Sequence, residues 1–391
     1  MIFFHKKTVA RRQRNRIQAI RESLGNWLYD EEDLMRHAMG YFSNLFKSES
    51  ATYQNYHVPN LFPALDSYDV DGAATPILRE KIKSTMFSMK PLKAPGTDGL
   101  HAIFYQSQRH VIGPSFCRLI KDIFTSGKVP QEINTTLLVL ILKEEHPSSL
   151  KMFRPISLCT VAYKTVTKII TNRLQSLLPN LIGPHQTSFV PERHIIDNIV
   201  VAQEVVHSMH RKTGKKRFMA IKVYLEKAYD RLNWDFIFET LQQTGIPIQL
   251  SRLIMECVTS VSMNILWNGE VTKAFAPGRG IRQGDPLSPY LFVLCIERLS
   301  HGITNAVMDG NWRPIRLAKN GTPLTHLFFA DDLILFAEAS IDQAYVIETI
   351  LDNYCRSLEA KVNKMKSLLL KECCLAGCQS HRYCIGSFGH K

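Results

Sequence analysis

Long hydrophobic runs and a regular cysteine pattern are both missing from this 391-residue chain. No apolar run approaches the length of about 18 to 20 residues that crosses a bilayer, and runs such as Leu137–Leu142 have the length of a buried strand. The 9 cysteines are scattered without regular pairing, and Met1–Phe4 is too short to be the apolar region of a signal peptide. These absences predict a soluble, intracellular protein in a reducing compartment, with no membrane partner.

Acidic residues are in the minority, with 35 Asp+Glu against 48 Lys+Arg and a formal net charge of +13. A basic excess of this size favours a polyanionic partner, and nucleic acid is the expected one. None of the first 21 residues is acidic. This stretch is expected to form a basic amphipathic helix or, alternatively, a solvated tail that binds anions without specificity. Its cations are Lys6, Lys7, Arg11, Arg12, Arg14, Arg16 and Arg21.

Two adjacent carboxylates, Asp331 and Asp332, stand between runs of strand-forming residues in the segment Leu324–Ala337. The pattern predicts a β-hairpin with the aspartates at its turn, beside an apolar sheet. Carboxylate oxygens bind hard divalent cations, and two-metal phosphoryl-transfer sites gather several carboxylates from different strands. The alternative is a solvated turn, because aspartate is a common turn residue.

A second strand is predicted at 219–225, because apolar residues alternate along it and leave Lys222 and Tyr224 on the opposite face. The glycine- and proline-rich loop 277–289 precedes an apolar helix at 290–303. Its glycines would let the backbone approach a nucleotide closely, and a plain strand-to-helix connection is the alternative. Further strands are expected at 136–142 and 153–158, and further helices at 34–46, at 164–178, at 197–209 and from a cap at Asn233 or Asp235 to Thr244.

Six short motifs follow one another along the chain. They are Lys93–Gly99, Phe153–Leu158, Glu226–Arg231, Arg282–Pro289, Phe329–Asp332, and Lys361–Asn363 with Lys366 and Ser367. In residue type and in order, over about residues 1 to 370, they resemble the reverse transcriptases of LINE-type (non-LTR) retrotransposons, in the form common in plant genomes. The occurrence of all six motifs in the family's order carries the resemblance.

The resemblance implies an α+β fold with the fingers and palm of a right-hand polymerase. A basic helical extension would occupy 1–75, and the reverse transcriptase domain 76–370, with fingers at 76–215 and a palm at 216–370. The palm would be a small antiparallel sheet backed by helices. Residues 371–391 would form an atypical tail. The chain resembles a truncated, degenerate member, with neither the upstream endonuclease domain nor an evident thumb.

The reaction that the resemblance implies is RNA-templated DNA synthesis, with an RNA template, a DNA primer and deoxynucleoside triphosphates as partners. Asp331 and Asp332 would be catalytic and would bind a pair of Mg²⁺ (or Mn²⁺) ions, together with a third carboxylate from the strand that ends near residue 224. One metal would lower the pKa of the primer 3′-hydroxyl. The other would hold the triphosphate and stabilise the leaving pyrophosphate.

Further residues match substrate-binding positions of the family. Lys143 and Arg154 would clamp the triphosphate from a fingers hairpin, and surface salt bridges are the alternative. Tyr229 would exclude a ribose 2′-hydroxyl, a role that is compatible with core packing. Gln283 would contact the nascent base pair and the nucleotide sugar or, alternatively, cap a loop. Lys366 would protonate the leaving pyrophosphate, or is simply solvated.

The main departure from the family is Tyr224, which stands where the third metal-binding carboxylate is expected. A phenol is neutral at pH 7 and does not fit the space of a carboxylate beside two cations. Glu226 has the same strand parity but lies about 6.6 Å further along, and Asp230 accompanies the catalytic acid in the family without replacing it. We expect an impaired two-metal site and a rate lowered on the order of a thousand-fold or more.

Smaller departures from the family pattern also indicate a degenerate member. Glu192 stands where the family usually has glycine, Leu142 where proline usually precedes Lys143, and Leu358–Ala360 replaces a glycine-containing turn. The tail invites comparison with a zinc knuckle, but its spacing is tighter than the common ones, so zinc is not expected. The residues concerned are Cys373, Cys374, Cys378, His381 and Cys384.

Two hypotheses of different class follow from the sequence. The first is a reverse transcriptase domain, weak or inactive because Tyr224 replaces a metal-binding aspartate. The second is a non-catalytic, nucleic-acid-binding retrotransposon remnant. We favour the fold and ancestry of the first with the activity of the second, and primer extension distinguishes them.

Overall fold

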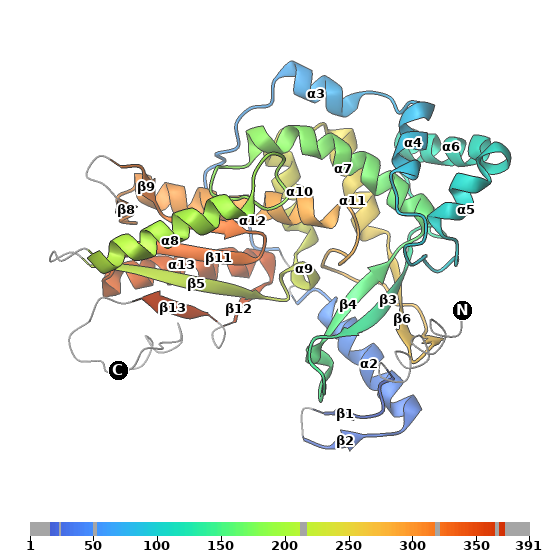
Figure 1. Ribbon diagram of the computed structural model, residues 1–391, viewed down its shortest axis with the longest axis horizontal. Coiled ribbons are helices and arrows are strands. Elements are labelled where there is room, and N and C mark those ends of the chain that lie inside the picture. The colour runs from blue at the N-terminus through green and yellow to red at the C-terminus, as the bar shows by residue number, and fades with distance from the viewer. Residues whose placement is uncertain are drawn as a thin grey trace. The chain divides into compact units, whose positions relative to one another are not determined.

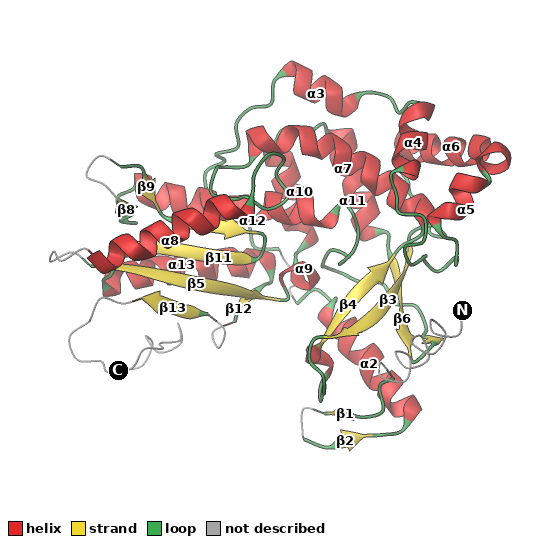
Figure 2. Cartoon of the chain, viewed as in Figure 1, coloured by secondary structure: helices red, strands yellow, loops and turns green. Residues whose placement is uncertain are grey.

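The structure is a computed structural model that describes residues 16–22, 25–49, 53–211, 217–316, 321–363 and 367–371. Helices and strands are interspersed along these residues (Figure 2), which confirms the α+β class. The chain divides into two compact units. The first unit comprises Met1–Lys47, Pro76–Ile170 and Arg252–Ser288, and the second unit comprises Ser48–Thr75, Thr171–Ser251 and Pro289–Lys391.

The first unit contains a four-stranded sheet and several helices. Its strands are β1 (Ile20–Arg21), β2 (Trp27–Leu28), β3 (Thr135–Leu142), β4 (Phe153–Leu158), β6 (Ser262–Trp267) and β7 (Glu270–Val271), and its helices are α2 (Glu31–Leu45), α4 (Arg79–Phe87), α5 (Ala102–Ser107), α6 (Arg109–Ser126) and the 3₁₀ helix η1 (Leu150–Met152). The main sheet has the order β4-β3-β6-β7, with β3 antiparallel to β4 and parallel to β6. The strands expected at 136–142 and 153–158 are therefore confirmed, as one hairpin.

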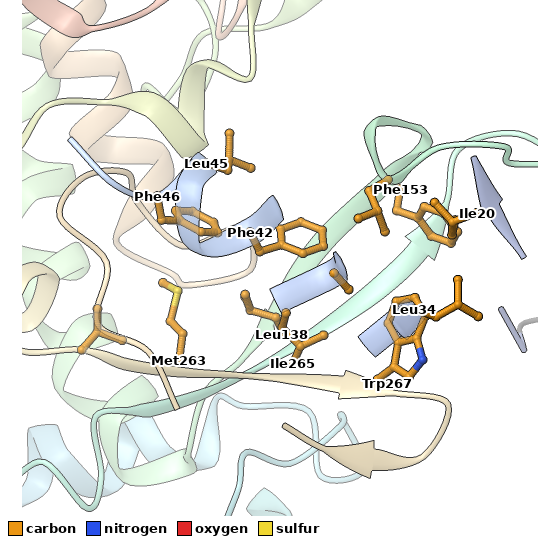
Figure 3. Close-up of a cluster of buried hydrophobic side chains, with 13 residues drawn as sticks. Ile20, Leu34, Phe42, Leu45, Phe46, Leu138, Phe153, Met263, Ile265 and Trp267 are labelled. Carbon is orange, nitrogen blue, oxygen red and sulfur yellow. The ribbon is translucent and has the colours of Figure 1, made fainter. Parts of the chain in front are cut away.

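The main sheet of the first unit packs against α2 through a hydrophobic cluster (Figure 3). Phe42 from α2, Leu138 from β3 and Trp267 from β6 are all buried in it. The side chain of Asp30 caps α2 by accepting the N–H groups of Glu32 and Asp33. Spacings of three or four residues then put one apolar face of the helix on the cluster, namely Leu34, Ala38, Phe42 and Leu45.

The basic N-terminal segment differs from the expected amphipathic helix where the structure describes it. Residues 16–22 contain no helix, and Ile20–Arg21 form β1, paired with β2. Ile20 is fully buried in the α2 cluster, and the N–H of Arg21 donates to the carbonyl of Ser148 at 2.7 Å. These tertiary contacts override local helix propensity. Residues 1–15 lie outside the described residues.

Among its described residues, the second unit contains a five-stranded sheet, a separate two-stranded sheet and several helices. Its strands are β5 (Phe218–Glu226), β8 (Ile315–Arg316), β9 (Pro323–Leu324), β10 (His326–Phe329), β11 (Asp332–Glu338), β12 (Lys361–Val362) and β13 (Leu368–Lys371), and its helices are α3 (Ser67–Ala74), α8 (Ile195–Arg211), α9 (Ala228–Arg231), α10 (Trp234–Gln243) and α13 (Ile341–Leu358). Residues of both units occur in α7 (Val161–Leu181), α11 (Ile248–Thr259) and α12 (Ser288–Met308). The helices expected around residues 34, 164, 197, 234 and 290 are confirmed as α2, α7, α8, α10 and α12.

Strand β5 is central in the five-stranded sheet of the second unit (Figure 1). It is antiparallel to β11 on one side and to β12 and β13 on the other, and β11 in turn pairs with β10. The predicted alternation is confirmed, since Met219, Ile221, Val223 and Leu225 are all buried. On the opposite face, Val205 and Met209 of α8 pack with Ala220, whereas Lys222 and Tyr224 stay partly exposed.

Within the ranges given above, the structure contains no helix that is long and apolar enough to cross a membrane. The described cysteines are free thiols, and all except Cys117 are buried. The cysteine-rich tail and its possible zinc ligands lie outside the described residues.

Candidate active site

The paired aspartates lie at the turn of the β10–β11 hairpin, as the sequence predicts. Phe329 is opposite Asp332, so Ala330 and Asp331 form the two-residue turn. Ala330 has a φ of 52°, a left-handed conformation that costs a non-glycine residue about 1 kcal/mol or more. The side-chain oxygen of Gln186 accepts the N–H of Ala330 at 3.3 Å. The hairpin and this contact fix both aspartates at one end of the sheet.

Tyr224 is the direct cross-strand neighbour of Asp332. The two residues are register partners between β5 and β11, and such partners have Cβ atoms about 4.5 to 5.5 Å apart on one face. On the other side of β5, the N–H of Asn363 donates to the Tyr224 carbonyl at 2.8 Å, and the Ser367 hydroxyl accepts the Tyr224 N–H at 3.2 Å. The predicted meeting of the strand near residue 224 with the aspartate hairpin is confirmed.

The ammonium of Lys222 lies beside both Asp332 and Tyr224. It lies 3.2 Å from Oδ1 of Asp332 and 4.7 Å from the ring centroid of Tyr224. Burial lowers the pKa of Lys222, but hydrogen bonds to Tyr224 and Asp332 outweigh burial and raise the pKa above its ordinary value. Lys222 is therefore a charged ammonium paired with one of the two aspartates. The sequence signal for it is the two-residue spacing that puts Lys222 and Tyr224 on one strand face.

Neither neighbouring acid is the strand partner of Asp332. Glu226 lies two residues beyond Tyr224 and is the register partner of Lys361 in β12. Asp230 lies in α9 and is buried. In the part of the chain that the structure describes, no group of three or more His, Cys, Asp or Glu side chains is arranged to hold a metal ion.

A cavity of about 520 Å³ opens beside the aspartate turn in the second unit. Tyr229 lines it, with its ring stacked on Phe292 at a centroid distance of 4.7 Å. Burial, together with the charge of Asp331, raises the pKa of Tyr229, so the phenol stays protonated. The structure therefore brings Tyr229 together with both aspartates while its ring also packs on a buried neighbour. The other lining residues are Thr187, Ser188, Phe189, Arg193, His194, Ile195, Phe329 and Ala330.

Glu192, one of the departures from the family, precedes Arg193 on the wall of this cavity. Its φ is 65°, in the region that glycine adopts without steric cost and glutamate does not. The Arg193 guanidinium donates to the carbonyl of Ile182 at 2.7 Å and to that of Gln186 at 2.8 Å. These bonds hold the segment in place, so the missing glycine leaves a backbone strain of about 1 kcal/mol.

Glu359 lies in the turn where the family has a glycine, and it also has a left-handed φ, of 56°. Its surroundings are different. The carboxylate accepts hydrogen bonds from the Ser48 hydroxyl at 2.7 Å, the Glu49 N–H at 2.8 Å and the Asn233 amide at 2.9 Å. An intramolecular hydrogen bond contributes about 0.5 to 1.5 kcal/mol net, so three of them together exceed a backbone strain of about 1 kcal/mol. The side chain therefore compensates for the strain in its own backbone.

We expect glycine at these two positions to have opposite effects on stability. Glu192→Gly should raise the free energy of unfolding by about 1 kcal/mol, because the strain is relieved. Glu359→Gly should lower it by about 1 to 3 kcal/mol, because the hydrogen bonds are lost. Urea denaturation followed by circular dichroism measures both, with Glu359→Gln as the control that keeps the side-chain length. A stabilising Glu359→Gly would show that its hydrogen bonds contribute little.

Lys143 and Arg154 lie on the β3–β4 hairpin of the first unit. Arg154 is the register partner of Ile141, and the N–H of Lys143 donates to the carbonyl of Met152 at 2.9 Å. The Lys143 ammonium also donates to the carbonyl of Lys151 at 3.2 Å. Both cationic side chains are exposed. The structure thus brings the two expected triphosphate-binding cations to one hairpin.

Gln283 lies in the loop that follows the last strand of the first unit. Its backbone carbonyl accepts the N–H of Ser157 in β4 at 2.7 Å. Gly284 comes next, with a φ of 110°, and a Cβ there would lie 3.1 Å from the carbonyl oxygen of Ser157. Glycine therefore allows the loop to lie directly on β4, with the Gln283 side chain partly exposed.

Arg282 anchors this loop, a role that the sequence does not reveal. Its buried guanidinium donates to Asn134 at 2.7 Å and to Thr136 at 3.1 Å, and its carbon lies 4.0 Å from the ring centroid of Tyr163. Asp285 forms an ion pair with it at 3.6 Å and accepts a hydrogen bond from the Tyr163 hydroxyl at 2.8 Å. Burial raises the pKa of Tyr163, which keeps its proton. The Arg-Gln-Gly-Asp motif therefore has a structural role within the first unit.

The predicted site residues fall in both units. Tyr224, Tyr229, Asp331 and Asp332 lie together in the second unit, whereas Lys143, Arg154 and Gln283 belong to the first. Lys366 lies outside the described residues.

Comparison with known proteins identifies the family. Residues 141–380, more than half of the chain, match the family model described as reverse transcriptase (RNA-dependent DNA polymerase). The transposon TX1 uncharacterized 149 kDa protein of Xenopus laevis is 28% identical over 95% of this chain and 28% of its own length. The retrovirus-related Pol polyprotein from the type-2 retrotransposable element R2DM of Drosophila melanogaster is 28% identical over 71% of this chain and 24% of its own length. An uncharacterized mitochondrial protein of Arabidopsis thaliana is 49% identical over 65 residues, which cover 17% of this chain and 53% of its own length.

The chain belongs to the reverse transcriptase family, as a domain of the LINE (non-LTR) type. The resemblance carried by the six motifs is thus confirmed. The chain spans about a quarter of the length of the first two relatives, at 28% and 24%.

Proposed function

We propose that the chain is an RNA-directed DNA polymerase domain whose catalytic activity is weak or lost. The observation that carries the proposal is Tyr224, which faces Asp332 where the family motif has a carboxylate. In this proposal residues 76–215 are the fingers and 216–370 the palm of a right-hand polymerase. A basic extension at 1–75 precedes them, and an atypical tail at 371–391 follows.

The proposed partners are an RNA template, a DNA primer and deoxynucleoside triphosphates. Asp331 and Asp332 would be the carboxylates of the catalytic centre. Tyr229 would bound the sugar of the incoming nucleotide, a role supported by its position in the same cavity as both aspartates. The remaining proposed substrate contacts are Lys143, Arg154, Gln283 and Lys366.

The residues present do not fit the family's two-metal centre. A pair of Mg²⁺ or Mn²⁺ ions needs several converging carboxylates. Among the described residues, Asp331 and Asp332 have no third acid grouped with them, and Asp332 is already ion-paired with Lys222. Tyr224 brings a phenol, not a carboxylate, to the position opposite Asp332. We infer that divalent-metal binding is impaired.

Primer extension by the unmodified chain tests this proposal. On a poly-rA template with an oligo-dT primer and Mg²⁺, we expect incorporation no greater than that of the double variant Asp331→Asn, Asp332→Asn. Both proteins then lack a complete set of metal ligands. Robust synthesis by the unmodified chain that is lost in the double variant would show that the chain is active. It would also support Asp331 and Asp332 as the catalytic carboxylates.

A second candidate function is nucleic-acid binding without catalysis, which is favoured by the net charge of +13. Cations on a protein neutralise phosphates and release counterions from nucleic acid. The exposed Lys143 and Arg154 are candidates for such contacts. This function is compatible with the loss of the metal site.

We expect the affinity for an RNA–DNA duplex to fall steeply as salt rises. With about four phosphate contacts, the affinity should drop on the order of a hundred-fold between about 50 and 200 mM salt. Fluorescence anisotropy of a labelled duplex measures it. The double variant Lys143→Gln, Arg154→Gln should flatten the logarithmic salt slope by about 1 to 2. An affinity that does not change with salt concentration would contradict a role for the basic residues in binding the duplex.

A further inference from the structure

We propose that Lys222 is an internal counter-ion of Asp332 and competes with divalent cations for this carboxylate. The inference rests on the proposed role of Asp332 in a metal site. It concerns a residue that none of the six sequence motifs contains.

The strand register creates the contact. Tyr224 is the partner of Asp332, and Lys222, two residues earlier in β5, is the partner of Ile334. Lys222 and Asp332 are therefore diagonal neighbours on one sheet face, a separation that a long side chain can bridge. The ammonium does so, at 3.2 Å from Oδ1 of Asp332.

Tyr224 also favours the position of the Lys222 ammonium beside Asp332. The Lys222 ammonium lies 4.7 Å from the centroid of the Tyr224 ring, within the distance at which an aromatic face attracts a cation. The phenol at position 224 thus removes a carboxylate from the proposed metal site and also stabilises the cation that neutralises Asp332.

The ion pair between Lys222 and Asp332 is partly exposed to solvent, so another cation can compete for Asp332. The side chain of Lys222 is 29% exposed and that of Asp332 is 52% exposed, and ion pairs in contact with water are weak. A divalent cation near Asp332 would therefore have to compete with the ammonium for this carboxylate. Lys222 would lower the apparent affinity of Asp332 for such an ion.

Mn²⁺ titration of the intact chain, followed by electron paramagnetic resonance of the free ion, tests this competition. Lys222→Met removes the charge, keeps the length of the side chain and can still pack on the Tyr224 ring. We expect it to bind Mn²⁺ about 5- to 10-fold more tightly than the parent, which corresponds to about 1 to 1.4 kcal/mol. Lys222→Arg, which keeps the charge, should bind no more tightly than the parent.

A matched control is Lys361→Met. Lys361 belongs to β12, on the other side of β5, and its ammonium lies 3.8 Å from Glu49. Its removal also lowers the net charge by one, so it reports any general electrostatic effect on Mn²⁺ binding. Its affinity should stay close to that of the parent.

Three results would overturn the inference. The first is Mn²⁺ affinity in Lys222→Met that does not exceed that of the parent, including no detectable binding. The second is an equal gain in Lys361→Met. The third is a gain that survives when Asp332→Asn is added, because the ion would then sit elsewhere. Lys222→Gln repeats the test if circular dichroism shows that Lys222→Met is unfolded. DNA synthesis by the unmodified chain would sink the proposed inactivity without affecting these comparisons.

Discussion

Tyr224→Asp is expected to raise primer-extension activity by about a thousand-fold or more. The substitution restores a carboxylate directly opposite Asp332 in the β5–β11 register. A missing anionic ligand costs several kcal/mol in the transition state of a two-metal reaction, and each 1.4 kcal/mol, roughly, is a factor of ten in rate. Initial rates of deoxynucleotide incorporation on poly-rA with an oligo-dT primer and Mg²⁺ measure the effect.

Tyr224→Asn is the matched control for this substitution. It removes the ring and leaves a side chain of the same size as aspartate without the charge. We expect it to remain at the background rate. Equal activity in the two variants would mean that relief of crowding, and not charge, had restored the site. Background activity in Tyr224→Asp would contradict the assignment of residue 224 as the missing ligand.

Arg282→Met is expected to lower the free energy of unfolding of the chain by about 3 to 5 kcal/mol. Asp285 would be left as a buried carboxylate without its partner at 3.6 Å, and the loss of one member of a buried ion pair has this cost. The oxygen of Asn134, which accepts from Arg282 at 2.7 Å, would also lose its donor. Urea denaturation followed by circular dichroism measures the loss.

Arg36→Met is the same substitution at an exposed ion pair. The guanidinium of Arg36 lies 2.8 Å from Asp33, and its side chain is 74% exposed. Such pairs contribute little, so we expect a change within about 0.5 kcal/mol. If the two arginine variants lost stability equally, the anchoring role of the Arg282 network would be refuted.

The sequence predicts well those features that depend on local periodicity. Apolar alternation predicted strand β5 and the face that carries Lys222 and Tyr224, and the apolar runs around Asp331 and Asp332 predicted the hairpin. The resemblance to the reverse transcriptase family implied that these two segments meet, and the register confirms it. The strand and the hairpin needed only short-range patterns, whereas their meeting rested on the family resemblance.

The sequence did not predict the contacts between residues that are far apart in the chain. The pairing of Lys222 with Asp332 depends on a register that a shift of one residue would abolish. Arg282 is held by Asn134 and Tyr163, which are far from it in the chain. The N-terminal cations suggested a helix, but the burial of Ile20 in the α2 cluster decides the structure of that segment where it is described.

The departures from the family pattern also have different physical meanings. Glu192 and Glu359 both occupy left-handed positions where glycine is favoured. The Glu359 carboxylate accepts hydrogen bonds that compensate for the strain in its own backbone. The Glu192 side chain is exposed to solvent instead. Sequence comparison alone cannot separate strain from compensation, because both appear as a missing glycine.

Anomalous diffraction from crystals grown with Mn²⁺ is the most direct test of the central claim, that Tyr224 fills the position of a metal-binding carboxylate. For the Tyr224→Asp variant, we predict an anomalous peak in contact with the carboxylates of residue 224 and of the aspartate turn. The unmodified chain should show a weaker peak at that position or none. An equally strong peak in the unmodified chain, or a variant peak that does not contact residue 224, would contradict the account.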